Sequence, residues 1–204
     1  MQYKTMIAGI SGTHGTGKTT IMNALMLAQQ SVDRSQISRT AQSNLGWSTL
    51  KDATKTVEST IEFQEAILMA MQERDKKIMD AGINTTVFVE RTPADVYAYA
   101  KWWMTNLHKC RMTHVMLWLN DFRNRCATWH DNYLTTIVVR PHHQIPFVED
   151  PNRASLDNRE FVKVEIESLV ADRQHHIITS LLSEERAAEC VMAVTAAKQL
   201  KGIK

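Results

Sequence analysis

A glycine-rich stretch near the N-terminus constrains this chain more than any other feature. Residues 12–19 read Gly-Thr-His-Gly-Thr-Gly-Lys-Thr and match the pattern G-x-x-x-x-G-K-[S/T]. An apolar segment typical of a buried strand, Tyr3–Ile10, precedes them, and a segment with helical apolar spacing, Lys18–Gln30, follows. In this context the loop N–H groups form a concavity for an anion, and the helix N-terminus adds its dipole. Residues 12–19, the phosphate loop below, are therefore predicted to bind phosphate groups.

The side chains of the phosphate loop have separate predicted roles. Lys18 brings a mobile cation to the β and γ phosphates of a nucleotide, and Thr19 offers its hydroxyl to Mg²⁺. ATP and Mg²⁺ are the expected cofactors. The other positions predicted to bind the nucleotide surround its phosphates, and they are Gly12, Thr13, His14, Gly15, Thr16, Gly17 and Thr20.

A second apolar segment ends in charged residues. Asn84–Glu90 is predicted to be a strand, and Arg91 and Thr92 follow it. Where a phosphate loop is present, an acid at such a strand end reaches Mg²⁺ directly or through water, and it can accept the proton of an acceptor hydroxyl. Glu90 is therefore predicted to be a metal ligand and a base. Arg91 is predicted to contact the substrate and the transferring phosphoryl group.

Predicted strands and helices alternate along the 204 residues. This alternation predicts one α/β domain whose mostly parallel sheet has helices on both faces, with ligands at the carboxyl ends of the strands. Residues at about 120–156 hold few periodic signals in their second half and are predicted to form a lid. The segments predicted as further strands are 36–40, 113–119 and 189–195, and those predicted as helices are 58–81, 121–133, 156–182 and a helix that begins near Pro93.

The composition is that of an ordinary soluble protein. Hydrophobic residues make up 44%, charged residues 23%, and the formal net charge is +2, so the overall charge favours neither nucleic acid nor a membrane as partner. The three cysteines lie far apart, as free thiols in a reducing compartment do. The sequence shows neither a signal peptide nor an apolar stretch long enough to span a bilayer. A cytoplasmic location is expected.

Several segments together resemble the thymidylate-kinase-like and NadR-like P-loop kinases, which include nucleoside and nucleotide kinases. The phosphate loop matches the ATP site of that family, and Glu90-Arg91-Thr92 is similar to its Asp/Glu-Arg-Ser/Tyr motif. Thr60–Leu68 resembles its long helix, and Asp150–Arg153 resembles its lid. The resemblance spans nearly the whole chain. It implies a three-layer P-loop kinase fold with a small lid, Mg-ATP as donor, and a nucleoside, a nucleotide or a related hydroxyl compound as acceptor.

The resemblance also implies roles for single residues. Gln64, on the long helix, is expected to bind the acceptor. Arg153 matches a lid arginine and is expected to stabilise the transferring phosphoryl group. Three further arginines, Arg123, Arg125 and Arg140, cluster near the predicted lid in the sequence, and Arg140 is expected to contact the substrate.

One departure from the family leaves the acceptor open. Relatives often carry an acid followed three residues later by arginine after their second strand, whereas this chain has Arg39-Thr-Ala-Gln42. A nucleoside or nucleotide acceptor is favoured. A basic stretch, Lys101–His143, allows a phage-type DNA kinase that acts on 5-hydroxymethyluracil within modified DNA. A third alternative is an ATPase switch without an acceptor, and a homodimer is compatible with each of them.

Overall fold

The computed structural model describes residues 5–142 and 157–203. Its strands are β1 (Met6–Ser11), β2 (Ser31–Asp33), β3 (Thr86–Glu90), β4 (Tyr133–Val138) and β5 (His175–Ile177). Its helices are α1 (Lys18–Leu27), α2 (Ile37–Asn44), α3 (Leu50–Ala53), α4 (Val57–Asp80), α5 (Pro93–Trp102), a short π-helix η1 (Trp103–Leu107), α6 (Thr113–His130), α7 (Asp157–Val170) and α8 (Ser183–Leu200).

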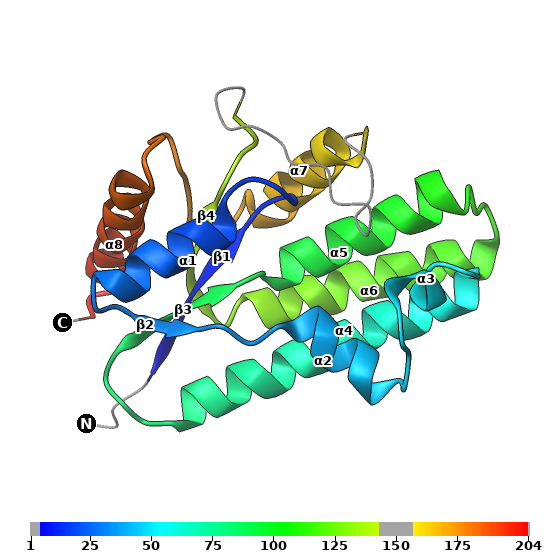
Figure 1. Ribbon diagram of the computed structural model, residues 1–204, viewed down its shortest axis with the longest axis horizontal. Coiled ribbons are helices and arrows are strands. Elements are labelled where there is room, and N and C mark those ends of the chain that lie inside the picture. The colour runs from blue at the N-terminus through cyan, green and yellow to red at the C-terminus, as the bar shows by residue number, and fades with distance from the viewer. Residues whose placement is uncertain (1–4, 143–156, 204) are drawn as a thin grey trace.

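The strands form a single sheet in the order β2-β3-β1-β4-β5 (Figure 1). Every pairing in this sheet is parallel. Parallel neighbours require crossover connections, and helices supply them. The phosphate loop follows the carboxyl end of β1 at the centre of the sheet. Because β3 runs beside β1 in the same direction, the carboxyl end of β3 also lies next to the loop.

The two faces of the sheet are covered by different helices. Alternate residues of β1 point to opposite faces, so Ala8 and Ile10 join the core beneath α1 and α8, while Ile7 joins a cluster with Ile78 of α4. On this second side α4, α5 and α6 lie together (Figure 1). The predicted three-layer α/β fold with helices on both faces is thus confirmed.

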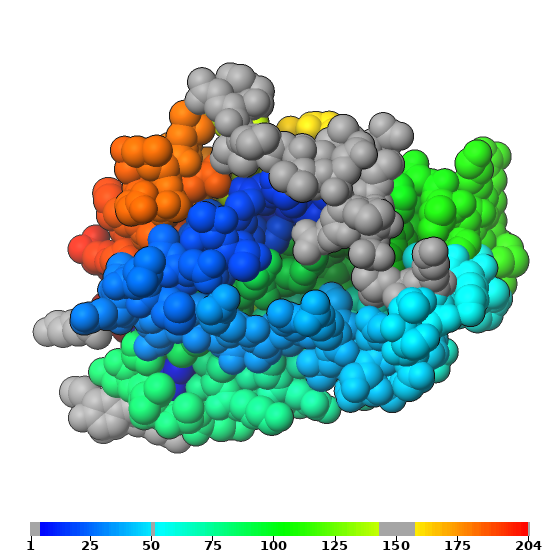
Figure 2. Space-filling model, in the orientation of Figure 1, coloured from blue at the N-terminus to red at the C-terminus, as the bar shows by residue number. Residues whose placement is uncertain are grey.

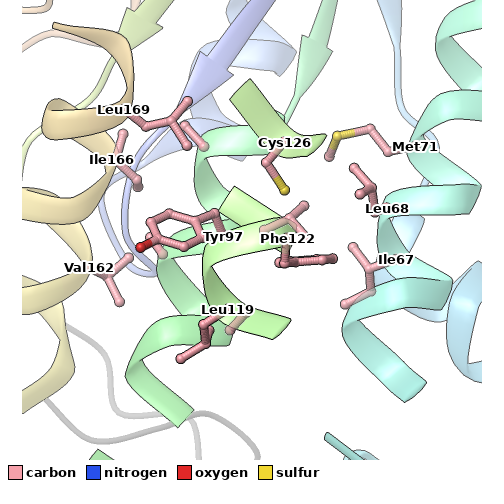
Figure 3. Close-up of a cluster of buried hydrophobic side chains, with 14 of the residues drawn as sticks. Ile67, Leu68, Met71, Tyr97, Leu119, Phe122, Cys126, Val162, Ile166 and Leu169 are labelled. Carbon is pink, nitrogen blue, oxygen red and sulfur yellow. The ribbon is translucent and has the colours of Figure 1, made fainter. Parts of the chain in front are cut away.

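The helices on the second side have a hydrophobic core of their own. Figure 3 shows it between α4, α5, α6 and α7. Phe122 of α6 is fully buried at its centre, with Ile67 and Leu68 of α4 on one side and Val162 and Ile166 of α7 on the other. Burying such side chains contributes about 1.5–3 kcal/mol each. This packing fixes the position of α5, and α5 in turn contacts the phosphate loop.

A buried ion pair supports the end of β3. Arg74 of α4 lies 2.8 Å from the Asp75 carboxylate, and it donates to the backbone carbonyl of Glu90 at 3.0 Å. The hydroxyl of Tyr133 donates to Asp75 at 2.8 Å, and the indole of Trp129 donates to it at 2.9 Å. Since both charges are paired and bonded, the pair is tolerated in the interior and fixes the backbone that carries Glu90.

Three predicted strands are wrong. Residues 37–40 lie in α2, whose N-cap is Gln36, residues 113–119 lie in α6, and residues 189–195 lie in α8. Short apolar runs do not distinguish a buried strand from the buried side of a helix, and Val115 and Leu119 of α6 are buried one helical turn apart. The actual edge strands, β2 and β5, have only partly buried or exposed residues and few apolar signals.

The predicted lid of about 120–156 is too long. Residues 120–130 belong to α6, and residues 133–138 form β4, a fully buried strand beside β1. The threonines within β4 obscured the apolar run on which strand prediction depends. The remainder of the predicted lid, residues 143–156, lies outside the described residues. Among the described residues, no helix has both the length and the apolar character to cross a membrane.

Candidate functional site

The glycines of the phosphate loop adopt backbone conformations with positive φ. Gly12, Gly15 and Gly17 have φ values of 148°, 67° and 85°, which side chains other than glycine rarely adopt. A Cβ at Gly12 would also lie 2.4 Å from the carbonyl oxygen of Val139. The loop begins directly after β1 and ends in α1, whose N-cap is Gly17. On the face shown in Figure 2, the blue segment that contains the loop and α1 lies between α8 and α2.

Lys18 lies across the loop. Its Nζ donates to the carbonyl oxygens of Gly12 at 2.7 Å and Thr13 at 2.6 Å, and the residue is 5% exposed. The hydroxyl of Thr16 donates to the Thr13 carbonyl at 2.9 Å. These contacts close the loop around the ammonium group, which brings a cation to the concavity where phosphates are predicted to bind.

Thr19 and Glu90 lie next to each other, as predicted for a metal site. The Thr19 hydroxyl is 3.2 and 3.3 Å from the two carboxylate oxygens of Glu90. A hydroxyl beside a carboxylate suits Mg²⁺, which takes one or two protein oxygens and completes its octahedron with phosphate and water. No group of three His, Cys, Asp or Glu side chains suited to a metal occurs in the described parts of the chain. The Thr19–Glu90 pair therefore fits a Mg²⁺ shared with a nucleotide.

Asp95 of α5 holds the start of the loop. Its Oδ2 accepts from the Ser11 hydroxyl at 2.7 Å and from the Thr92 backbone and hydroxyl at 2.8 and 3.1 Å. Its Oδ1 accepts from the Gly12 N–H at 3.1 Å, and the residue is fully buried. Thr92 is the N-cap of α5, and Asp95 completes its capping box. One carboxylate thus caps α5 and fixes the loop.

Tyr99, one turn further along α5, makes a second contact with the loop. Its hydroxyl accepts the backbone N–H of His14 at 3.0 Å and lies 3.3 Å from the ring Nδ1 of His14. The guanidinium of Arg91 lies over the Tyr99 ring, 5.4 Å from its centroid. Arg91 itself has a φ of 68°, a strained conformation for a residue with a side chain. This geometry links the Glu90-Arg91 motif to the loop through α5.

Helix α8 contacts the loop from another direction. Arg186, which is buried, donates from NH1 to the carbonyl of Thr16 at 3.0 Å and from Nε to the carbonyl of Ser180 at 2.9 Å. The turn between β5 and α8 is held by Glu189, whose carboxylate accepts the backbone N–H groups of Thr179 and Ser180 at 3.1 Å each. Glu189 thereby fixes the turn on which Arg186 depends.

The stability of this turn is expected to decrease at acid pH. Burial alone would raise the pKa of Glu189, but hydrogen bonds from His176 and Ser180 outweigh it and lower the pKa from about 4.5 to about 2. The folded state therefore binds this proton less readily than the unfolded chain. The contribution of Glu189 is present above pH 4.5 and is lost as the pH falls towards 2.

Urea unfolding from pH 5 to pH 2 measures this effect, and Glu189→Gln should flatten the decrease in unfolding free energy over that interval. Glu185→Gln, at an exposed position of the same helix, should retain the wild-type slope. An unchanged slope in Glu189→Gln would contradict the assignment.

The predicted acceptor residue Gln64 is buried on the inner side of α4. It is 1% exposed, and its Oε1 has no hydrogen-bond partner among the described residues. The adjacent Phe63 stacks on Trp103 with a centroid distance of 6.1 Å and an interplanar angle of 12°. On its other side Phe63 contacts Trp47 at 5.8 Å. An unpaired buried amide oxygen suits a ligand that offers an N–H group.

The structure brings only part of the predicted set together. The phosphate loop, Glu90 and Arg91 converge at the carboxyl ends of β1 and β3. Arg140 instead forms a two-bond ion pair with Glu167 of α7, at 2.7 and 2.9 Å. Arg125 pairs with Glu65 and Asp121, and Arg123 lies over the Tyr97 ring. These three arginines are thus dispersed among separate partners. Arg153, a predicted lid arginine, lies outside the described residues.

Sequence reasoning missed Asp95, Tyr99, Arg74 and Arg186. Asp95 had a readable signal, because it stands three residues after Thr92 at a helix start that Pro93 marks. Tyr99 follows one turn later, and nothing in the sequence around it indicates a contact with the loop. Arg74 and Arg186 had no signal, since nothing in the sequence indicates that α4 supports β3 or that α8 reaches the loop.

Solved structures of other proteins share this fold. The solved structure of deoxyadenosine kinase from M. mycoides with bound dATP has a TM-score of 0.67 at 14% identity, covering 93% of this chain and 100% of that chain. NadR protein in complex with NR gives 0.65 at 14% identity, covering 98% of this chain but 52% of that one. Thymidylate kinase from Ehrlichia chaffeensis gives 0.56 at 15% identity, covering 93% and 98%.

At these identities the likeness shows the fold, which is that of the P-loop nucleotide kinases. No curated protein sequence matches the chain. A family model described as an AAA domain, AAA_28, matches residues 8–181, which include the phosphate loop, Glu90 and Asp95. The chain therefore belongs to the AAA_28 family of P-loop domains.

Proposed function

We propose that this protein is an ATP-dependent phosphotransferase that moves the γ-phosphoryl group of Mg-ATP to a nucleoside or nucleotide. The observation that carries this proposal is the contact between the Thr19 hydroxyl and the Glu90 carboxylate, at 3.2 Å. It joins the phosphate loop to the strand end that holds Glu90 and Arg91. The likeness in fold to deoxyadenosine kinase and thymidylate kinase supports it.

The residues of the site suit in-line transfer. The loop N–H groups and Lys18 would bind the β and γ phosphates, and Thr19 and Glu90 would hold Mg²⁺, which neutralises phosphate charge when bound. Glu90 would also accept the proton of the attacking hydroxyl. Arg91 would stabilise charge on the transferring group, and Arg153 is proposed to do so from the lid.

The acceptor is proposed to carry a planar base. Gln64 offers a buried Oε1 without a partner among the described residues, and an acceptor N–H group would satisfy it. Trp47 and Trp103 pack on Phe63, the residue before Gln64, and both are only partly buried, so their rings would stack on a nucleobase of any kind. Arg140 would reach a substrate only after leaving Glu167.

A second candidate acceptor is a modified base within DNA. Lys109 and Arg111 line an open cavity at the turn between η1 and α6, both are exposed, and residues 101–120 contain no acid. In the described structure no ion pair neutralises these two side chains. Such a surface attracts a phosphodiester backbone. This surface makes DNA the second candidate acceptor, with less support than a free nucleoside or nucleotide.

Transfer of the terminal phosphoryl group of labelled ATP tests these proposals. The acceptors are nucleosides, nucleoside monophosphates, plain DNA and DNA that contains 5-hydroxymethyluracil, each with Mg²⁺ and with a chelator. We expect label on a free nucleoside or nucleotide only when Mg²⁺ is present. Label confined to modified DNA would establish the second candidate. ATP hydrolysis that no acceptor changes would instead indicate the ATPase switch and refute the kinase proposal.

A further inference from the structure

Arg186 is a buried cation whose hydrogen-bond partners in the described part of the chain are neutral. It is 5% exposed, and its printed hydrogen bonds run to the backbone carbonyls of Thr16 and Ser180. The other buried arginine of the helices, Arg74, has the carboxylate of Asp75 at 2.8 Å. Among residues 5–142 and 157–203, no carboxylate lies within 4.0 Å of Arg186. The two arginines therefore differ in how their charge is neutralised.

The nearest acid does not supply the missing charge. Glu189 follows Arg186 on α8, but its carboxylate accepts from His176 at 2.7 Å and from the backbone of Thr179 and Ser180. Burial lowers the pKa of the Arg186 guanidinium, and attraction to Glu189 offsets this only in part. A buried charge without a counter-ion is costly, and proteins normally pair it or place it where a ligand carries the opposite charge.

The position of Arg186 indicates which ligand that is. Its NH1 bonds the carbonyl of Thr16, and a Cβ added to Gly17 would lie 3.1 Å from the same atom. The peptide between Thr16 and Gly17 is planar and trans, so the N–H of Gly17 points away from the carbonyl that Arg186 binds. Arg186 thus contacts the backbone of the phosphate loop immediately before Lys18.

We propose that Arg186 is a second cation of the donor site, whose charge is neutralised by the phosphates of a bound nucleoside di- or triphosphate. This inference rests on the proposed function, because it assumes that the loop binds such a nucleotide. It assigns to α8 a role in binding the nucleotide donor, in addition to the role proposed for the Glu90-Arg91 motif. Lys18 and Arg186 together would then bring two positive charges to the polyphosphate.

Two substitutions separate the charge of Arg186 from its hydrogen bonds. Arg186→Lys keeps the charge and one donor group, whereas Arg186→Gln keeps donor groups without the charge. Isothermal titration calorimetry with ATP and with inorganic tripolyphosphate measures both variants. We expect Arg186→Gln to weaken binding of both probes by roughly 10- to 100-fold, because one buried positive charge near the phosphates is lost. Arg186→Lys should remain within about fivefold of the wild type, because attraction between charges tolerates a change of shape.

Arg173 provides the matched control. It also bonds two backbone carbonyls, those of Leu169 and Ala127 at 3.0 Å each, but it pairs with Asp131. Arg173→Gln should leave the affinity for ATP and tripolyphosphate unchanged. Thermal melts without ligand show whether each variant is folded.

Two results would overturn the proposal. If Arg186→Gln binds both probes as the wild type does, Arg186 carries no charge that the phosphates need. If Arg186→Lys and Arg186→Gln weaken binding equally, the hydrogen bonds to the loop matter and the charge does not. The proposed function is tested separately. Wild-type protein that binds no ATP, or that binds ATP without transferring label to any acceptor, would refute the kinase proposal. The comparison of the variants with tripolyphosphate does not depend on that result.

Discussion

Lys18→Ala should abolish phosphoryl transfer while leaving the protein folded. The ammonium group bonds the carbonyls of Gly12 and Thr13 and would lie against the β and γ phosphates, where negative charge is concentrated in the transition state. Removing one such preorganised charge lowers the rate by about 10³-fold or more. Steady-state assays with the acceptor that takes up label should give a decrease in kcat of at least that size.

Stability measurements distinguish this effect from unfolding. Lys18 bonds the carbonyls of Gly12 and Thr13, which belong to the loop and not to the hydrophobic core, so the circular dichroism spectrum and the melting temperature should change little. Lys201→Ala, at an exposed position beyond α8, serves as the control for loss of a lysine. Full transfer activity in Lys18→Ala would refute the assignment of residues 12–19 as the donor site.

Asp95→Asn should destabilise the whole domain, although it changes neither the size nor the shape of the side chain. Each carboxylate oxygen accepts a backbone N–H, Oδ1 from Gly12 and Oδ2 from Thr92. An asparagine can therefore face only one of them with its oxygen, and in either orientation its amide NH₂ meets the other N–H. Leaving a buried donor opposed in this way and removing a buried charge-assisted bond should cost about 3 kcal/mol.

Chemical denaturation measures this loss. Asp121→Asn is the matched control, since that aspartate is 66% exposed and pairs with Arg125 of the same helix. It should change the unfolding free energy by less than about 0.5 kcal/mol. We also expect Asp95→Asn to weaken ATP binding, because the loop loses its attachment to α5. Wild-type stability in Asp95→Asn would show that the four contacts of Asp95 contribute little.

The sequence was sufficient to predict the central part of the site. The phosphate loop, β1, β3 and the start of α5 at Pro93 were all predicted, because each depends on neighbouring residues: glycines that permit positive φ, an apolar run, and a proline at the first helical position. The loop and the acid at the end of β3 were expected to meet, since parallel strands that flank one another end at the same edge.

The rest of the fold needed tertiary contacts. Val115 and Leu119 read as a strand, but their neighbours in space are Phe122 and the residues of α5, α4 and α7 that surround it. Burial on one side of a helix and burial of a short strand produce similar runs of apolar residues. Conversely, the threonines of β4 are buried and lie between β1 and β5, where the pairing of neighbouring strands satisfies the backbone.

The phosphate loop was therefore determined by the sequence itself, since its conformation follows from the residues within it. The groups that hold the loop in place were decided by the tertiary structure. Asp95 and Tyr99 of α5 and Arg186 of α8 lie 83, 85 and 170 residues away from the loop residues they bond. Contacts over such separations depend on how helices pack on the sheet, and no local pattern encodes that packing.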